Sequence, residues 1–176
     1  MNFVRALREV AAFLDPRGFR HAVVGGVGLA ALGLPRATID LDFVVDAAAQ
    51  EPLIAHLESD GFETLHRSRG YSNHLHPEAE RGRLDFVYVV GETAAAIFGS
   101  ALDLEGPGGL PMRVPRPEHL AAMKVHAMKN DPERSLQEMA DIRFLLTLPG
   151  VDRDVVRERF ERAGLADRYR EIEATL

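Results

Sequence analysis

This chain of 176 residues contains no cysteine and no tryptophan. Without cysteine there can be no disulfide, no thiolate zinc site and no cysteine nucleophile. The sequence also lacks a run of eighteen apolar residues, so we expect no transmembrane helix. Its first fifteen residues, MNFVRALREVAAFLD, alternate charged and apolar positions at helical spacing, which is typical of an amphipathic helix and not of a signal peptide. These absences favour a cytoplasmic protein with no membrane partner.

Positive charge is in short supply as well. The chain has 21 Lys and Arg against 27 Asp and Glu, which gives a formal net charge of −6. Residues 1–112 carry 9 basic and 15 acidic side chains, whereas residues 113–176 carry 12 of each. No segment is a polybasic tract, so any nucleic acid would have to be bound through a local patch. A dedicated DNA-binding regulator, which needs a basic recognition helix, is therefore disfavoured.

Apolar periodicity and turn signals divide the chain into a mixed half and a helical half. In the first half we predict helices over residues 2–14, 27–32, 47–60 and 92–100, and strands over residues 21–24, 39–45, 62–65, 71–76 and 84–90, with short strands within 101–114. After Pro115 we predict only helices, over residues 117–129, 132–147, 152–163 and 166–174. The sequence therefore predicts an α+β core over residues 1–114 and a helical region over residues 115–176 that packs on it.

The glycine pair Gly25-Gly26 joins a predicted strand to a predicted helix. Such a turn exposes backbone N–H groups at a helix N-terminus, where phosphate binds. Gly26 and Gly28 resemble the start of a dinucleotide-binding fingerprint, but its third glycine would fall on Ala31. Taken alone, the glycines are equally typical of a tight, closely packed turn.

Two acidic residues, Asp40 and Asp42, lie in an otherwise apolar strand pattern thirteen residues further on. On a strand, positions i and i+2 share a face, so both carboxylates point the same way while Leu41 points into the core. Converging carboxylates repel each other unless a cation lies between them, and a hard divalent ion with oxygen ligands is the simplest occupant. A solvated edge strand or a helix cap is the alternative interpretation.

A third acid, Asp85, begins the apolar segment LDFVYVV. Two-metal phosphoryl chemistry commonly uses three carboxylates, and the third can also accept the proton of an attacking hydroxyl. A phosphate-binding turn next to a metal site is what phosphoryl or nucleotidyl transfer requires. The alternative for Asp85 is a simple cap at the start of a strand.

The segment VVGG…ATIDLDFVV resembles the signature of the nucleotidyltransferase (Pol β-like) superfamily, and Asp85 matches its third acid. The wider pattern resembles the AbiEii/AbiGii (MenT-like) toxin family, because Pro35, Arg36 and Thr38 fit its opening motif. A helix with Lys124 and a second helix with Asp141 resemble the continuation of that family. The resemblance spans roughly residues 20–148. The sequence departs from it at residues 137–138, where Gln-Glu replaces a basic-acidic pair.

This resemblance implies a mixed sheet flanked by helices and a Mg²⁺- or Mn²⁺-dependent enzyme that moves an NMP from an NTP to an acceptor hydroxyl. It implies a metal site on Asp40, Asp42 and Asp85 and a nucleotide site on the residues that follow: Gly25, Gly26, Arg36, Thr38, Lys124 and Asp141. In this view Lys124 neutralises triphosphate oxygens, Asp141 orients Lys124 or contacts substrate, and Arg36 clamps a phosphate.

The sequence does not identify the acceptor of the NMP group. The toxin resemblance favours an RNA acceptor such as the 3′ end of a tRNA, together with a cognate antitoxin protein. A small-molecule acceptor such as an antibiotic would use the same site. A non-catalytic nucleotide-binding domain is the alternative from another class, although three intact acids argue against it. His74 and His76 can share a strand face, but no third metal ligand lies at a suitable spacing, and His126 is better explained as a structural residue.

Overall fold

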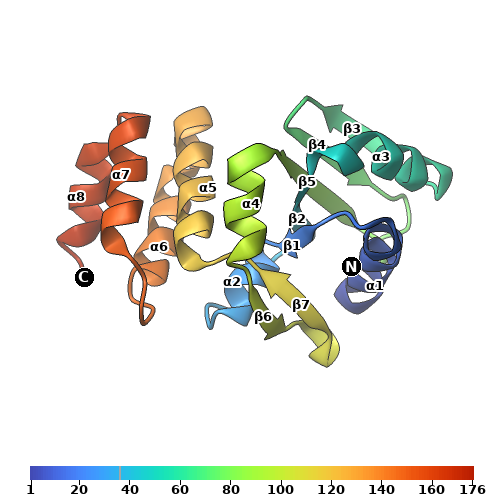
Figure 1. Cartoon of the computed structure of the whole chain (residues 1–176), viewed down its shortest axis with the longest axis horizontal. Helices are drawn as coiled ribbons and strands as arrows, with labels where there is room; N and C mark the ends of the chain where they lie inside the picture. Colours follow the sequence, from blue (N-terminus) through green and yellow to red (C-terminus); the bar gives the residue numbers. More distant parts are fainter. Residues whose placement is uncertain (36) are drawn as a thin grey trace. The chain divides into compact units, whose positions relative to one another are not determined.

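The computed structural model describes residues 1–35 and 37–176, so the predicted phosphate-binding Arg36 lies outside the described residues. The chain forms two compact units, Met1–Val114 and Pro115–Leu176. The first unit combines helices with a sheet of five strands in the order β1-β2-β5-β4-β3 (Figure 1). Its strands are β1 His21–Val23, β2 Asp40–Asp46, β3 Glu63–Arg67, β4 Tyr71–Leu75 and β5 Arg83–Val89. Its helices are α1 Phe3–Leu14, α2 Gly25–Ala31, α3 Gln50–Ser59 and α4 Gly91–Gly99, and a hairpin of β6 Leu102–Glu105 and β7 Pro111–Val114 ends the unit.

The five-stranded sheet is mixed. Strands β2 and β5 pair in parallel at its centre, while β1 and β4 pair antiparallel to β2 and β5 respectively, and β3 pairs antiparallel to β4. This arrangement confirms the predicted mixed sheet flanked by helices. The parallel pair places Asp42 directly opposite Asp85, so the starts of both central strands lie at the same edge of the sheet.

The two central strands divide their side chains between two faces. Leu41, Phe43, Leu84 and Phe86 are buried on the core face, where the rings of Phe43 and Phe86 stack with centroids 5.4 Å apart. Successive side chains on a strand alternate between faces. The neighbouring acids Asp40, Asp42 and Asp85 therefore point away from this core. The apolar alternation that builds the core thus also fixes the direction of the acids.

Two helices supply further apolar surface to the first unit. Helix α1 buries Leu7, Val10 and Leu14 along one stripe, and its N-cap Asn2 accepts a hydrogen bond from the backbone N–H of Arg5. Helix α3 buries a short stripe that includes Leu53. The predicted helix at residues 27–32 begins earlier than expected, at Gly25, because glycine adopts the positive φ of +59° with which α2 starts.

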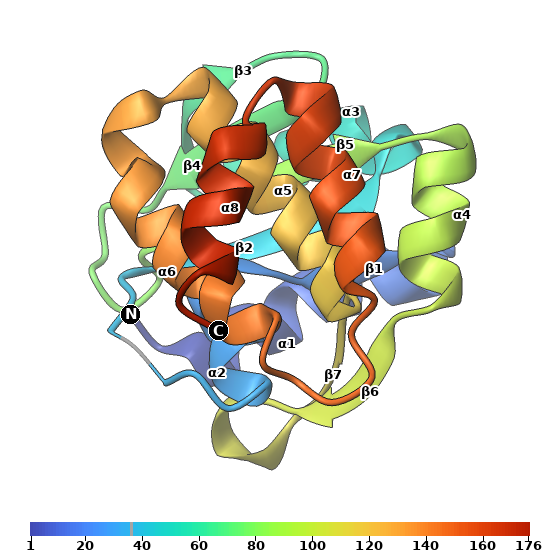
Figure 2. The ribbon, with the colours of Figure 1, turned by 90° about the vertical axis from the view of Figure 1, so that its left-hand side faces the viewer.

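The second unit is entirely helical. It consists of α5 Pro117–Asn130, α6 Ser135–Leu145, α7 Arg153–Ala163 and α8 Ala166–Glu173, which pack side by side (Figure 2). Helix α5 contacts both α6 and α7, and α8 contacts the same two helices. The predicted helix at 132–147 starts instead as a single 3₁₀ turn, because Pro132 follows the cap residue Asp131. Within the described residues, none of the helices has the length and apolar character needed to cross a bilayer.

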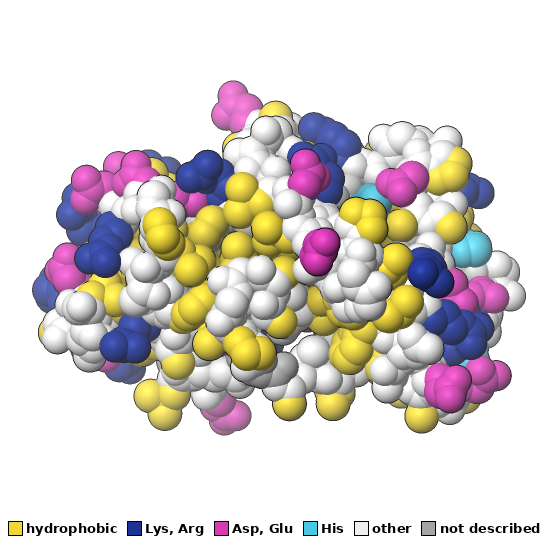
Figure 3. All heavy atoms as spheres, turned by 90° about the horizontal axis from the view of Figure 1, so that it is seen from below, with side chains coloured by type: hydrophobic (Ala, Val, Ile, Leu, Met, Phe, Trp, Pro, Cys, Tyr) yellow, Lys and Arg dark blue, Asp and Glu magenta, His cyan; other side chains and the backbone are white. Residues whose placement is uncertain are grey.

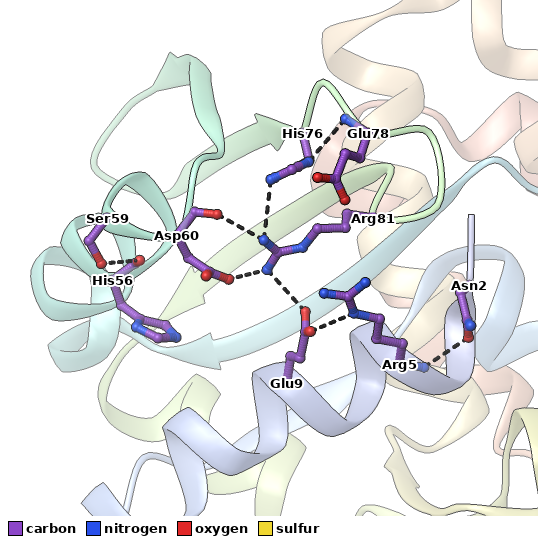
Figure 4. A network of polar contacts seen from close by, with 9 residues as sticks. All are labelled: Asn2, Arg5, Glu9, His56, Ser59, Asp60, His76, Glu78 and Arg81. Carbon is purple, nitrogen blue, oxygen red and sulfur yellow. Dashed lines mark hydrogen bonds and ion pairs between the residues drawn. The ribbon is translucent and has the colours of Figure 1, made fainter.

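Arg81 connects three segments of the first unit that are far apart in sequence. Its guanidinium is 8% exposed, pairs with Asp60 after α3, and lies 3.1 Å from the carboxylate of Glu9 on α1 (Figure 4). It also donates to the backbone carbonyl of Asp60 at 2.8 Å and lies 4.9 Å from the ring of Phe62. Glu9 additionally receives a hydrogen bond of 2.7 Å from Arg5, one turn earlier on α1.

We expect R81M to lower the free energy of unfolding by roughly 2 kcal/mol, because it removes a buried arginine that donates charge-assisted hydrogen bonds to Asp60 and Glu9. R5M is the matched control: it removes another arginine from the same Glu9, but from an exposed i,i+4 pair. That pair should contribute less than about 0.5 kcal/mol. Chemical denaturation of the two variants tests the difference, and equal losses would contradict a structural role for Arg81.

The Arg81 contact also gives this stability a pH dependence. The hydrogen bond from Arg81 holds the pKa of Asp60 below its ordinary value. A carboxyl whose pKa is lower in the folded state stabilises the fold above its unfolded pKa, and that contribution disappears as the pH falls through the folded pKa. The stability gap between the wild type and R81M should therefore narrow on the acidic side of about pH 4.

Candidate active site

The three acids of the sequence motif converge at one edge of the central sheet. Asp40, Asp42 and Asp85 each bring a carboxylate oxygen within 4.8 Å of the other two. Asp85 is 7% exposed, and the other two are half-buried. Strand alternation and the parallel register of β2 with β5 produce this convergence, since Asp42 and Asp85 are directly paired. Three hard oxygen donors at this spacing fit Mg²⁺ or Mn²⁺.

Gly25 begins α2 directly against the second acid. A Cβ added at this position would lie 2.6 Å from Cγ of Asp42 and closer still to its Oδ2. The backbone also connects these segments, because the N–H of Val24 donates to the carbonyl of Asp42 at 2.9 Å. The absence of a side chain at Gly25 thus brings the first turn of α2, whose N–H groups have no intrahelical acceptor, to the acid cluster.

Gly26 and Thr38 form the adjoining wall of the site. A Cβ on Gly26 would lie 2.7 Å from Cβ of Thr38, so this position too requires a glycine. The Thr38 hydroxyl donates to Oδ1 of Asp40 at 2.5 Å. Thr38 therefore fixes the orientation of the first acid from outside the strand.

Two residues that hold Asp85 were not among those predicted from the sequence. Arg83 donates from Nε to Oδ1 at 2.8 Å and from Nη2 to Oδ2 at 3.0 Å, and the Tyr71 hydroxyl donates to Oδ2 at 2.8 Å. Burial and the hydrogen bond to Asp85 raise the pKa of Tyr71 to about 12, so it stays protonated as a donor. The bond to Asp85 also raises the pKa of Arg83. The contact of Arg83 could have been predicted, because Arg83 lies two positions before Asp85 on the same strand. The contact of Tyr71 could not, because it depends on the pairing of β4 with β5.

Gly26 and Thr38 also line a cavity of about 500 Å³. Its lining is mostly apolar and includes Phe3, Val27 and Met112, with Glu105 among the few polar residues. This volume lies within the usual range for pockets that hold small molecules. The residues that adjoin the acid cluster, Gly26 and Thr38, thus also border a space of small-molecule size.

In the helical unit, Lys124 lies in a buried ion cluster. Its Nζ is 2.7 Å from Oε2 of Glu138 and 2.5 Å from Oδ2 of Asp141, and the side chains of both acids are at most 5% exposed. Arg134 approaches the other oxygen of Glu138 at 2.9 Å. Glu138, at one of the two positions where the sequence departs from the toxin pattern, is thus a direct partner of Lys124.

We expect K124M to lower the free energy of unfolding by about 3 kcal/mol, because it strips two buried carboxylates of their shared cation. K129M, on an exposed position of the same helix, is the control and should change stability by less than about 0.5 kcal/mol. Thermal and urea unfolding of both variants measure the difference. If K124M and K129M have the same free energy of unfolding, the ion cluster does not stabilise this unit.

Among the residues that the structure describes, His74 and His76 belong to no cluster of metal-ligating side chains. His74 is fully buried, with its ring nitrogens 3.0 Å from the Thr64 hydroxyl and 2.9 Å from the Ser72 hydroxyl, and burial lowers its pKa. His76 accepts a hydrogen bond from the backbone N–H of Glu78. Both rings therefore belong to the packing of the first unit. His126 lies 2.9 Å from the Asn130 amide on the exposed side of α5.

Comparison with known proteins identifies the fold. No protein-family model matches this sequence, and no curated protein matches it. The structure is similar to the solution structure of the antibiotic-resistance factor ANT(2″)-Ia, with a TM-score of 0.67 and 20% identity over 99% of this chain and 98% of that chain. A crystal structure of ANT(2″)-Ia with adenylyl-2″-tobramycin gives a TM-score of 0.65 and 21% identity over 94% and 98% of the chains. The lincomycin-bound lincosamide antibiotic adenylyltransferase LnuA gives 0.54 and 15% over 83% and 98%. The chain thus has a nucleotidyltransferase-like fold.

Proposed function

We propose that this protein is a nucleotidyltransferase that moves an NMP from an NTP to an acceptor hydroxyl, with Mg²⁺ or Mn²⁺ as cofactor. One observation carries the proposal: three carboxylates within 4.8 Å of one another lie at the start of two parallel strands, directly against the glycine turn of α2. A structural role alone does not explain three acids gathered at one edge, because their mutual repulsion costs stability.

The chemistry assigns separate tasks to these groups. Asp40, Asp42 and Asp85 would hold the cation, which neutralises charge on the polyphosphate during transfer. Gly25 and Gly26 would bring backbone N–H groups of α2 to the phosphates. The acceptor hydroxyl would attack the α-phosphate in line, and pyrophosphate would leave. Asp85 is also the candidate to accept the proton of that hydroxyl.

The family resemblance supplies the remaining roles. Lys124 would neutralise triphosphate oxygens and Asp141 would orient it, an assignment supported by the 2.5 Å contact between them. Thr38 would contribute through its bond to Asp40. Arg36 would clamp a phosphate.

The observations on this chain favour a small cationic molecule as the acceptor. Residues 1–112 carry 15 acidic against 9 basic side chains, which attracts cations and repels nucleic acid. The cavity beside Thr38 has the size of a small-molecule pocket. The solved structures similar to this chain over most of its length include adenylyltransferases for antibiotics. We therefore place an antibiotic-like polyhydroxylated amine first among acceptors.

A tRNA 3′ end is the second candidate, in a toxin that a cognate antitoxin would restrain. It is favoured by the match of Pro35, Arg36, Thr38 and the two following acids to the toxin family's opening motif. Charge argues against it: on the face drawn in Figure 3, the described Lys and Arg side chains alternate with Asp and Glu and do not gather into a basic patch. RNA binding depends on such patches.

The test is a transfer assay with the purified full chain. Each α-³²P-labelled NTP is incubated with Mg²⁺ and, in separate reactions, with an aminoglycoside panel, a lincosamide panel and total tRNA. We expect label on a small amine in one panel. Label on tRNA alone would overturn the small-molecule acceptor and support the toxin candidate. No label with any acceptor, and no rise in melting temperature with Mg²⁺ and NTP, would overturn nucleotidyl transfer altogether.

A further inference from the structure

Asp85 is held from two sides on the sheet. Its strand β5 lies between β2, which carries Asp42 directly opposite, and β4, which carries Tyr71. Arg83 reaches Asp85 from two positions earlier on its own strand, with the same face in common. We call Tyr71 and Arg83 the Asp85 clamp. Their three hydrogen bonds, at 2.8, 2.8 and 3.0 Å, all end on the carboxylate of Asp85.

The clamp uses most of the hydrogen-bonding capacity of Asp85. A carboxylate has about four lone-pair directions, two on each oxygen. Oδ2 accepts from both Tyr71 and Nη2 of Arg83, so both of its lone pairs are engaged. Oδ1 accepts only from Nε of Arg83 among these donors. With the clamp in place, one lone pair of Oδ1 is left for the acid cluster.

We propose that Tyr71 and Arg83 are positioning residues, which present Asp85 to the reaction through the single remaining lone pair of Oδ1. This inference rests on the proposed function. Asp85 would then contact one cation at a time and would not bridge two cations. Arg83, which pairs in register with Asp40, also supplies positive charge that keeps the three acids together before a cation binds.

Removing the clamp should affect turnover and cation binding more than nucleotide binding. For Y71F we expect a 10- to 100-fold decrease in kcat and a comparable rise in the Mg²⁺ concentration for half-maximal activity, as for other groups that orient metal ligands. KM for the NTP should change by less than about threefold, because the clamp touches no nucleotide group directly. R83Q should lower kcat more than R83K does, because lysine keeps the positive charge. R83K should still fall below the wild type, because lysine cannot form the forked pair.

Y88F provides the matched control. Tyr88 lies on the same strand as Asp85 but points to the opposite face, and its hydroxyl bonds Ser72 at 2.8 Å. The substitution removes one tyrosine hydroxyl bond from this sheet without touching Asp85. It should lower the melting temperature as Y71F does, yet leave kcat and the Mg²⁺ requirement unchanged. A merely structural role for Tyr71 predicts that the two variants behave alike.

Direct binding of Mn²⁺, followed through the electron paramagnetic resonance signal of the free ion, tests the clamp without any turnover. We expect Y71F and R83K, which leave the charge at the acid cluster unchanged, to bind Mn²⁺ about tenfold more weakly than the wild type and Y88F. Wild-type affinity in both clamp variants would overturn the inference, whatever the activity. If the wild type binds Mn²⁺ more tightly than the clamp variants but transfers no NMP to any acceptor, the clamp stands as a cation-site feature and the proposed function fails.

Discussion

D42N should abolish NMP transfer, with kcat reduced by roughly a thousandfold or more, while the protein stays folded. The substitution keeps the shape of the side chain but removes one of the three charges that converge within 4.8 Å. Loss of that charge weakens cation binding and exposes the polyphosphate charge that the cation would neutralise. The measurement is single-turnover transfer of α-labelled NMP at saturating NTP, together with the melting temperature in the presence and absence of Mg²⁺.

D46N is the matched control for this experiment. Asp46 lies on the same strand and the same face as Asp42, but its carboxylate pairs with Arg20 at 2.8 Å, away from the acid cluster. We expect D46N to retain activity within about threefold and to keep the rise in melting temperature with Mg²⁺. Without Mg²⁺, D42N should melt no lower than the wild type, since it relieves repulsion between acids. Full activity in D42N would show that the acid cluster takes no part in the transfer reaction.

G25A should have the largest combined effect on stability and activity. A Cβ at this position would collide with the carboxylate of Asp42, and the φ of +59° is itself unfavourable for alanine. Strain of about 1–2 kcal/mol from φ and a further 1–3 kcal/mol from overpacking predict a loss of roughly 2–5 kcal/mol. Any relaxation must move α2 or Asp42, so we also expect transfer to fall by at least about a hundredfold.

G91A separates the collision from the backbone strain. Gly91 begins α4 with a φ of +58°, almost the value at Gly25, but a Cβ there would meet no atom within 4 Å. G91A should therefore cost only the 1–2 kcal/mol of strain and leave transfer intact. Chemical denaturation and transfer assays on both variants give the comparison. Equal stabilities for G25A and G91A would show that α2 does not press against the acid.

The local part of this architecture was predictable from sequence. Alternation around Leu41 places Asp40 and Asp42 on one face of a strand, and the fold class follows from strands that alternate with amphipathic helices. The structure confirms the mixed sheet and brings Asp85 to the same edge. Their roles in transfer are still proposals. The start of α2 differed from prediction because a helix beginning on a glycine at positive φ has no capping signature in the sequence.

Contacts that depend on pairing between distant segments could not be read from the sequence. Tyr71 reaches Asp85 only because β4 pairs antiparallel with β5 in one particular register. Glu138 meets Lys124 only because α5 packs against α6, and in the sequence it was merely a departure from a family pattern. Local periodicity specifies which face a side chain occupies but not which distant residue it meets.

The parallel pairing of β2 with β5 also has a consequence for the order of synthesis. Asp42 and Asp85 are 43 positions apart, and the segment between them contains α3 and the β3–β4 hairpin. Pairings across such separations form slowly, because a long loop must close before any contact compensates for its lost entropy. A nascent chain therefore carries only two of its three acids until β5 has left the ribosome and found β2. Before that moment the emerging protein should lack the cation site that we propose for these three acids.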